Sequence, residues 1–343
     1  SINSYYQIDG IANEWVFATR SSYQGKIPAI DKLTSSLQDD QNFYRTEILQ
    51  SQTGNDSMKY NFRGISQFSS VRNTDTSSTL DKLGFKSDGT NLNLRYQNNT
   101  LLMDSLFGIK YNISDRNPQK FAFHKLETQG NQTLYQNEKA LSLAFLTASP
   151  YKDIPFSNLT LDNQKNFLNH LTGQSLTYYQ RLQPLKTNSD NPSQGPQKAK
   201  VEADSFLTYA SIEYELYVQN DSQLYVNLPS LEFENEDYTD VEIITNGQVN
   251  RYTTDNVFPF FTIGHFTAGE TVKVRIAFPE NSTVTFQNPE FFALNLQAYQ
   301  EAFERVHQQE VHVQTKGNTV TADFSADHHT SLFFTLPYDK GWT

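Results

Sequence analysis

The second half of the chain alternates apolar and polar residues with a period of two, as strands that bury one face do. From Ile212 to Val218, every second residue is apolar. The dipeptide Asn246-Gly247 lies between two such runs and is a strong hairpin signal. This spacing predicts an antiparallel β-sandwich over residues 201–290. Further runs of this kind cover residues 223–228, 240–245, 248–252 and 271–278.

The first half of the chain mixes helical and strand-like patterns, which predicts a mixed α+β domain over residues 1–182. Residues 74–83 show a helix pattern with a capping residue, Thr74 or Asp75, at the start and Gly84 after the end. The other predicted elements are helices at 101–107 and 161–171, and strands at 40–50, 92–96, 108–111, 121–126 and 141–146.

Residues 183–200 are polar, contain Pro and Gly, and lack an apolar period, so they are predicted to form a linker. Beyond the sandwich, an apolar stripe at helical spacing predicts a helix over residues 292–306. Strands are predicted at 311–314, 319–324 and 331–336. The pattern as a whole predicts a β-rich α+β chain. Residues 291–343 are expected to form a helix and C-terminal strands that are truncated, because a strand begins where the chain stops.

Composition narrows the class of protein. No window approaches the roughly 18 to 20 consecutive apolar residues that span a bilayer. With no cysteine, the chain has no disulfide, thiolate nucleophile or Cys-based metal site. The formal net charge is -11 and the basic residues are scattered, which argues against nucleic acid as a partner. Ser1 opens directly into polar sequence, so we expect a piece excised from a longer protein.

Residues that carry metal or acid-base chemistry give weak signals. Asp323, Asp327, His328 and His329 are a candidate metal cluster, but adjacent histidines on a strand point to opposite faces. The acidic run over residues 232–240 lacks the ligand spacing of a calcium loop and fits a solvated strand face. No nucleophile elbow, phosphate-binding Gly loop or His-Glu-x-x-His motif is present. The sequence therefore predicts no catalytic centre, metal or cofactor in this chain.

Residues 61–70, with the sequence NFRGISQFSS, are the most unusual local segment. An Arg-Gly pair precedes a dense set of hydroxyl and amide groups. Such a segment can bind a phosphate or a sugar through the guanidinium and backbone N–H groups. It can equally form a turn that its own side chains cap. The residues alone leave both interpretations open.

Three segments, taken together, resemble the large extracytoplasmic region of the YfhO family of bacterial multi-pass membrane proteins. They are Tyr60–Ser70 with the following Leu80–Phe85, then Leu102–Tyr111, then Leu336–Thr343. Residues 135–141 and 260–266 resemble the family more weakly. Members of this family look like GT-C type glycosyltransferases, which pass sugar from an undecaprenyl-phosphate carrier to a surface polymer, typically lipoteichoic acid in Gram-positive bacteria. The resemblance places the chain at the extracytoplasmic face of the cell membrane. The family's catalytic carboxylates lie in its membrane bundle, so none is assigned here.

The leading hypothesis is an accessory ectodomain over the membrane-embedded portion of the same polypeptide. It would position a teichoic-acid-type polymer or the undecaprenyl-phosphate-linked sugar. Among the residues predicted to bind it, the arginine and lysine would bind phosphate, the glutamine amide and serine hydroxyls would bind sugar, and the tyrosine ring would stack on the sugar. The predicted ligand-binding residues are Arg63, Gln67, Ser69, Ser70, Lys110 and Tyr111.

The alternative is a non-catalytic scaffold or a glycan- or protein-binding surface module, which a flat aromatic patch on the sandwich would favour. A glycoside hydrolase would need two carboxylates facing each other across a cleft, and nothing in the sequence indicates them.

Overall fold

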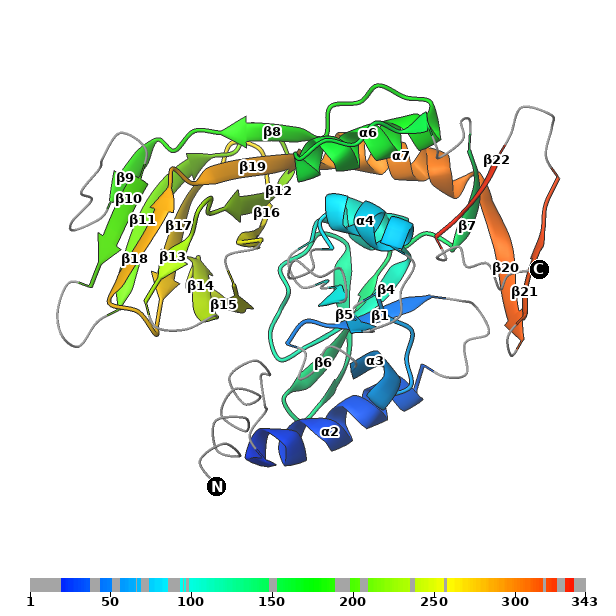
Figure 1. The fold of residues 1–343 in the computed structure, drawn as a ribbon, viewed down its shortest axis with the longest axis horizontal. Helices are drawn as coiled ribbons and strands as arrows, with labels where there is room; N and C mark the ends of the chain where they lie inside the picture. Colours follow the sequence, from blue (N-terminus) through cyan, green and yellow to red (C-terminus); the bar gives the residue numbers. More distant parts are fainter. Residues whose placement is uncertain are drawn as a thin grey trace.

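The computed structural model describes most of the chain, and its strands form several sheets with helices packed on them (Figure 1). Among the described strands, β1 (Arg45–Ile48) and β4 (Ile109–Ser114) form the parallel pair, and the other neighbours are antiparallel. This confirms the predicted β-rich α+β class. No helix in this part of the chain is long and apolar enough to cross a bilayer. The described residues are 20–37, 44–50, 56–65, 67–68, 74–85, 93–94, 96, 99–147, 153–188, 198–203, 209–234, 238–255, 258–316, 319–325 and 331–335.

The first half of the chain forms a four-stranded sheet with helices beside it. Its other elements are α2 (Arg20–Ser35), α3 (Asp56–Lys59), β2 (Gln67–Phe68), α4 (Thr74–Lys82), β3 (Asn93–Leu94), α5 (Leu101–Leu106), β5 (Phe123–Gln129) and β6 (Gln132–Asn137). The strand order is β1-β4-β6-β5. Against one face of this sheet lies α2, whose Ile30 and Leu33 share a small core with Ile48, Ile113 and Leu134. The helix α5 is buried along its whole length in the larger main core.

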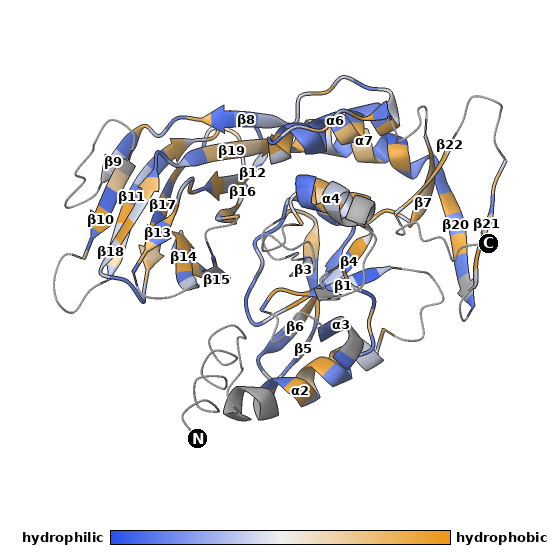
Figure 2. Cartoon of the chain, viewed as in Figure 1, coloured by the Kyte–Doolittle hydropathy of each residue, from blue (hydrophilic) through white to orange (hydrophobic). Residues whose placement is uncertain are grey.

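The following strands build a β-sandwich of two facing sheets with a three-stranded sheet beside them. They are β8 (Tyr179–Leu182), β9 (Lys186–Asn188), β10 (Lys198–Glu202), β11 (Ala210–Tyr217), β12 (Ser222–Asn227), β13 (Glu232–Phe233), β14 (Thr239–Thr245), β15 (Gln248–Thr254), β16 (Phe260–Phe266), β17 (Thr271–Phe278), β18 (Thr283–Gln287) and β19 (Glu290–Asn295). The orders are β15-β14-β17-β11-β9, β16-β12-β19-β8 and β10-β18-β13. Alternate residues of β11 and β17 enter the shared apolar core, as the period of two predicts. Figure 2 colours the chain by the hydropathy of each residue.

The sheet β16-β12-β19-β8 is covered on both of its faces. Along β12, Leu224 enters the sandwich core, whereas the next residue, Tyr225, enters the main core of the first half. The buried amide of Gln223 also joins the two halves, since its oxygen accepts from Phe121 N at 2.9 Å and its nitrogen donates to Gln119 O at 2.8 Å. The first half and the sandwich are therefore packed directly together, and this face of the sandwich is closed to ligands.

The C-terminal segment returns to the first half of the chain. Helix α7 (Leu296–His307) lies beside α6 (Thr160–Thr172) (Figure 1). Beyond α7, the sheet order is β21-β20-β7-β22, so the short strand β7 (Ala144–Thr147) is flanked on both sides by C-terminal strands. These strands are β20 (Glu310–Lys316), β21 (Thr319–Asp323) and β22 (Ser331–Phe334).

The structure differs from the sequence-based expectation at several elements. The helix predicted over 292–306 begins later, because the chain first forms β19 and then caps α7 with Asn295, whose side-chain oxygen accepts from Ala298 N at 3.0 Å. The strands β2, β6, β8, β16 and β18 are absent from the prediction. The division into domains stays a prediction, although the expected linker, 183–200, contains β9 and the start of β10. Its residues 189–197 lie outside the described residues.

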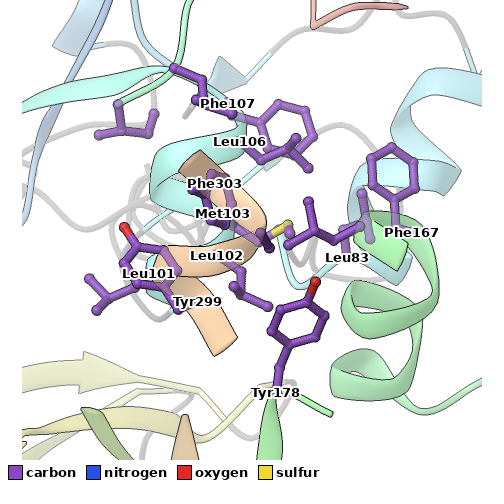
Figure 3. Close-up of a cluster of buried hydrophobic side chains, with 14 of the residues drawn as sticks. Leu83, Leu101, Leu102, Met103, Leu106, Phe107, Phe167, Tyr178, Tyr299 and Phe303 are labelled. Atoms are coloured by element: carbon purple, nitrogen blue, oxygen red, sulfur yellow. The ribbon is translucent and has the colours of Figure 1, made fainter. Parts of the chain in front are cut away.

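Two buried tyrosines of the main core offer a matched test of its polar contacts. Tyr178 points its hydroxyl toward apolar side chains of the core (Figure 3), and this oxygen has no hydrogen-bond partner in the described part of the chain. In contrast, the hydroxyl of Tyr225 accepts from the backbone N of Leu101 at 2.9 Å, at the start of α5.

Tyr178→Phe is expected to leave the free energy of unfolding unchanged or to raise it by about 1 kcal/mol, because it removes an unpartnered buried hydroxyl. Tyr225→Phe should lower it by about 1 to 3 kcal/mol, because the N–H of Leu101 then has no acceptor. Urea unfolding of both variants measures the difference. An equal loss of stability in the two would contradict this assignment.

Candidate functional site

Three consecutive residues of β1 hold together the segments that carry the sequence motifs. The first is Arg45, which is 5% exposed. Its Nη1 donates to Phe107 O at 2.6 Å and to Thr335 Oγ1 at 3.1 Å, and its Nη2 donates to Thr335 O at 2.8 Å. Burial lowers the pKa of the Arg45 guanidinium to about 10, while the nearby charge of Glu47 acts in the opposite direction. Arg45 thereby fixes the end of β22 to the turn that leads into β4.

The next two residues of β1 hold the Arg-Gly motif. Thr46 N donates to Arg63 O at 2.8 Å, and the buried carboxylate of Glu47 accepts from Ile65 N. Between these contacts the backbone of Gly64 lies so close to β1 that an added Cβ would be 3.2 Å from Glu47 Oε1 and 3.3 Å from Thr46 O. A glycine at this position allows the close approach. We call Arg45, Thr46 and Glu47, with their partners, the β1 junction.

A buried polar cluster lies in the same region as the β1 junction. The side chain of Asp104 is fully buried and that of Lys120 is 7% exposed, with Lys120 Nζ 3.1 Å from Asp104 Oδ2. The same Nζ donates to Tyr96 Oη at 3.0 Å and to Asn112 Oδ1 at 2.9 Å, while the Tyr96 hydroxyl donates to Asp104. Charge-assisted hydrogen bonds therefore compensate the buried charges.

The electrostatics of this cluster follow from its burial. Desolvation raises the pKa of Asp104, and the charge of Lys120 together with the Tyr96 hydrogen bond opposes that rise. Burial also raises the pKa of Tyr96 well above its ordinary value, and the adjacent Asp104 carboxylate adds to the shift. A phenol held so firmly in its protonated form is a donor to the carboxylate at physiological pH. The cluster is suited to holding the fold and has no open coordination or nucleophilic position.

The structure places the predicted ligand-binding residues in different environments. Arg63 is exposed next to the β1 junction. Lys110 is half-buried, with its Nζ 5.1 Å from the ring centroid of Tyr44 and 5.5 Å from that of Tyr111. Tyr111 is 7% exposed in the core beneath α2 and packs edge-on against Tyr44, an arrangement that favours packing over stacking on a ligand.

The remaining predicted residues lie mostly outside the described part of the chain. Gln67 belongs to β2, but its side chain, together with Ser69 and Ser70, is outside the described residues. Of the candidate metal cluster, only Asp323 is described, on β21. Among the residues that the structure describes, no group of three or more His, Cys, Asp or Glu side chains is arranged to hold a metal ion.

Sequence reasoning missed the charged residues that organise this site. Asp104 interrupts the apolar run Leu101–Leu106, and a charge in such a run is a signal for a buried, compensated group. Arg45 and Glu47 alternate with Thr46 and Ile48 on a strand that is buried at all four positions. The sequence predicts that the face of the strand with Arg45 and Glu47 is exposed to solvent. The segments that cover this face are distant in the chain, so no local pattern indicates them.

The fold and the β1 junction define a β-rich α+β protein in which buried charges tie distant segments together. A family model described as bacterial membrane protein YfhO matches residues 1–343, and the chain belongs to this family. No match was found among curated protein sequences.

Several solved structures resemble part of this chain, and carbohydrate-active proteins are among them. An active-site mutant of a family two carbohydrate esterase from Clostridium thermocellum is 11% identical, with a TM-score of 0.24, and the match covers 33% of each chain. The carbohydrate-binding module CBM36 in complex with calcium and xylotriose is 12% identical, with a TM-score of 0.21, over 34% of this chain and 98% of that one. The match thus spans a third of the esterase. At these TM-scores the likenesses carry no argument about what this chain does.

Proposed function

We propose that this chain is the outward-facing domain of a membrane glycosyltransferase-like protein. In this role it assists the transfer of sugar from an undecaprenyl-phosphate carrier to a surface polymer such as lipoteichoic acid. Membership of a bacterial membrane protein family over the whole chain supports this role. The observation that carries it is the exposed Arg63, whose backbone is bonded to β1.

The β1 junction gives Arg63 a rigid base. The backbone bonds Thr46 N to Arg63 O and Ile65 N to Glu47 fix the segment on both sides of Gly64. A guanidinium that extends from a fixed backbone loses less freedom when it binds a phosphate with its two parallel N–H groups. The positive charge of Arg63 supports recognition of a phosphate group over a neutral sugar at this position.

A second cation lies on the neighbouring strand. Thr46 bonds to Arg63 on one side of β1 and pairs with Tyr111 of β4 on the other, next to Lys110. Two cations on segments that flank β1 suit successive phosphates of a polymer or the diphosphate or phosphate of a lipid-linked sugar. Since the formal net charge of the chain is -11, attraction of a polyanion depends on such local cations.

Calorimetric titration of the chain with lipoteichoic acid and short glycerol-phosphate oligomers tests this proposal. Arg63→Ala is expected to weaken binding by about tenfold, the effect of one lost charge-assisted contact. Lys110→Ala should act in the same direction. The matched control is Arg181→Ala, because Arg181 is an exposed arginine on β8 that lies 3.6 Å from Glu290.

The result that contradicts acceptor binding is a well-folded wild type that binds neither ligand, or an equal effect of Arg63→Ala and Arg181→Ala. Either result favours the alternative function, a non-catalytic scaffold. In that case the only role of the buried charges of the β1 junction is to stabilise the fold. A sandwich surface that binds glycans or proteins has less support, because the exposed Tyr217 ends β11 and the exposed Tyr209 precedes its start, eight residues away.

A further inference from the structure

A cavity of about 610 Å³ opens between the C-terminal ends of α6 and α7 and the strand β7. Its volume lies within the roughly 300 to 1,000 Å³ that small-molecule sites occupy. Leu146, Leu171 and Val306 provide its apolar lining. These elements are distinct from β1 and β4, which carry the cations of the proposed function.

The rest of the lining is built from amide and charged side chains. Along α7, Glu301, Glu304, Arg305 and Gln308 follow the spacing i, i+3, i+4 and i+7, so they share one face of the helix. No hydrogen bond or ion pair within the described part of the chain engages these four side chains, and all four are exposed. They are therefore available to a ligand that enters the cavity.

Gln174 adds a buried acceptor to this lining. The left-handed Gly173, at φ 65°, ends α6 and turns the chain so that Gln174 lines the cavity. The Oε1 atom of Gln174 is buried and has no hydrogen-bond partner among the described residues. A buried carbonyl oxygen without a donor is costly, and rotation of the Gln174 side chain toward the cavity would let a ligand hydroxyl satisfy it.

The donors and acceptors of this lining select one kind of ligand. Carboxylates only accept hydrogen bonds, a guanidinium only donates them, and amides do both. Hydroxyl groups satisfy all three types at once. A phosphate would meet the like charge of Glu301 and Glu304, and a simple cation would meet the like charge of Arg305.

We infer that this cavity is a binding site for an uncharged sugar unit. Hydroxyls donate to Glu301, Glu304 and Gln174 and accept from Arg305 and Gln308, while a C–H face of the ring packs on the apolar lining. This site goes beyond the proposed function, which rests on phosphate recognition near Arg63. Through this cavity the domain binds the uncharged part of a glycan.

Saturation-transfer NMR and titration of the whole chain with methyl glucopyranoside and N-acetylglucosamine test the site, with glycerol phosphate and trialanine as the competing probes. Wild type should bind at least one of the two sugars and neither competing probe in the cavity. Glu304→Ala and Gln174→Leu should each weaken sugar binding by about tenfold or abolish it. The control is Glu138→Ala, which removes an exposed carboxylate paired with His124 at 3.3 Å.

Each other outcome overturns the inference. A folded wild type that binds neither sugar shows that the cavity is not a site for these uncharged sugars. Sugar binding that survives Glu304→Ala and Gln174→Leu places the sugar elsewhere, and tight binding of trialanine or glycerol phosphate in the cavity identifies a different ligand class. Glycerol-phosphate binding that depends on Arg63 is measured separately, so failure here and failure of the proposed function are distinguishable.

Discussion

Asp104→Ala is expected to lower the free energy of unfolding by about 3 to 5 kcal/mol, because it leaves a buried ammonium without its counter-charge. Lys120, with 7% of its side chain exposed, would keep only neutral partners, Tyr96 and Asn112. Those two groups cannot replace a carboxylate at 3.1 Å. The double variant Asp104→Leu, Lys120→Met should recover much of the loss, because no charge then remains buried.

Urea unfolding monitored by circular dichroism measures this effect. The matched control is Asp115→Ala, since Asp115 pairs with Arg116 at 3.1 Å but the two side chains are 21% and 32% exposed. Pairs with this exposure contribute about 0 to 1 kcal/mol. If Asp104→Ala costs no more than Asp115→Ala, the buried pair does not have the role assigned to it.

The pH dependence of stability offers a second signature of Asp104. Burial raises the pKa of this carboxyl in the folded protein, so the folded state holds the proton more tightly than the unfolded state. Between the unfolded and folded pKa values, the unfolded state binds fewer protons, and stability therefore falls as pH rises through this window. Relative to Asp104→Asn, wild type should lose stability over that pH range.

Arg45→Ala is expected to lower the free energy of unfolding by about 3 to 5 kcal/mol and to release the end of β22. The substitution leaves the carbonyl oxygens of Phe107 and Thr335 without their donors and removes the positive charge near buried Glu47. Arg45→Lys should fall between wild type and alanine, because one ammonium cannot reproduce the forked geometry.

Hydrogen exchange followed by mass spectrometry locates this effect. Faster exchange is expected over residues 331–335 in Arg45→Ala, together with a lower urea midpoint. The control is Arg251→Ala, because the Arg251 side chain is 44% exposed and pairs with Glu242 of β14, in a different sheet from β22. Unchanged exchange at 331–335 in Arg45→Ala would show that the guanidinium does not hold the strand.

The sequence predicts β11 and β17, which alternate between core and solvent, but not the start of β19, which is covered on both faces. The run from Ile212 to Val218 alternates because β11 contacts core on one side and solvent on the other. Phe291–Leu294 belongs to a sheet covered on both faces, so its apolar residues follow one another without a period. A short continuous apolar run fits a buried strand and a buried helix equally well, so the pattern predicts a helix where β19 begins.

The site is harder to predict than the fold because its contacts are remote in sequence. The motif around Arg63 stands out by its composition, and its exposed guanidinium is found next to the β1 junction. The acceptor of Arg45, Thr335, lies 290 residues away, and no local pattern indicates that pairing. The half-burial of Lys110 between two tyrosines likewise depends on Tyr44, which precedes β1.

The position of β7 has a consequence for the order in which a nascent chain can fold. This four-residue strand pairs with β20 and β22, and its Thr147 bonds to Ser331, which is made 184 residues later. Until those residues have emerged, both edges of β7 expose unpaired backbone groups that invite association with other chains. Such non-local pairing is slow because a long loop must close first. A chain with this topology is therefore exposed to aggregation until its C-terminal strands have been made.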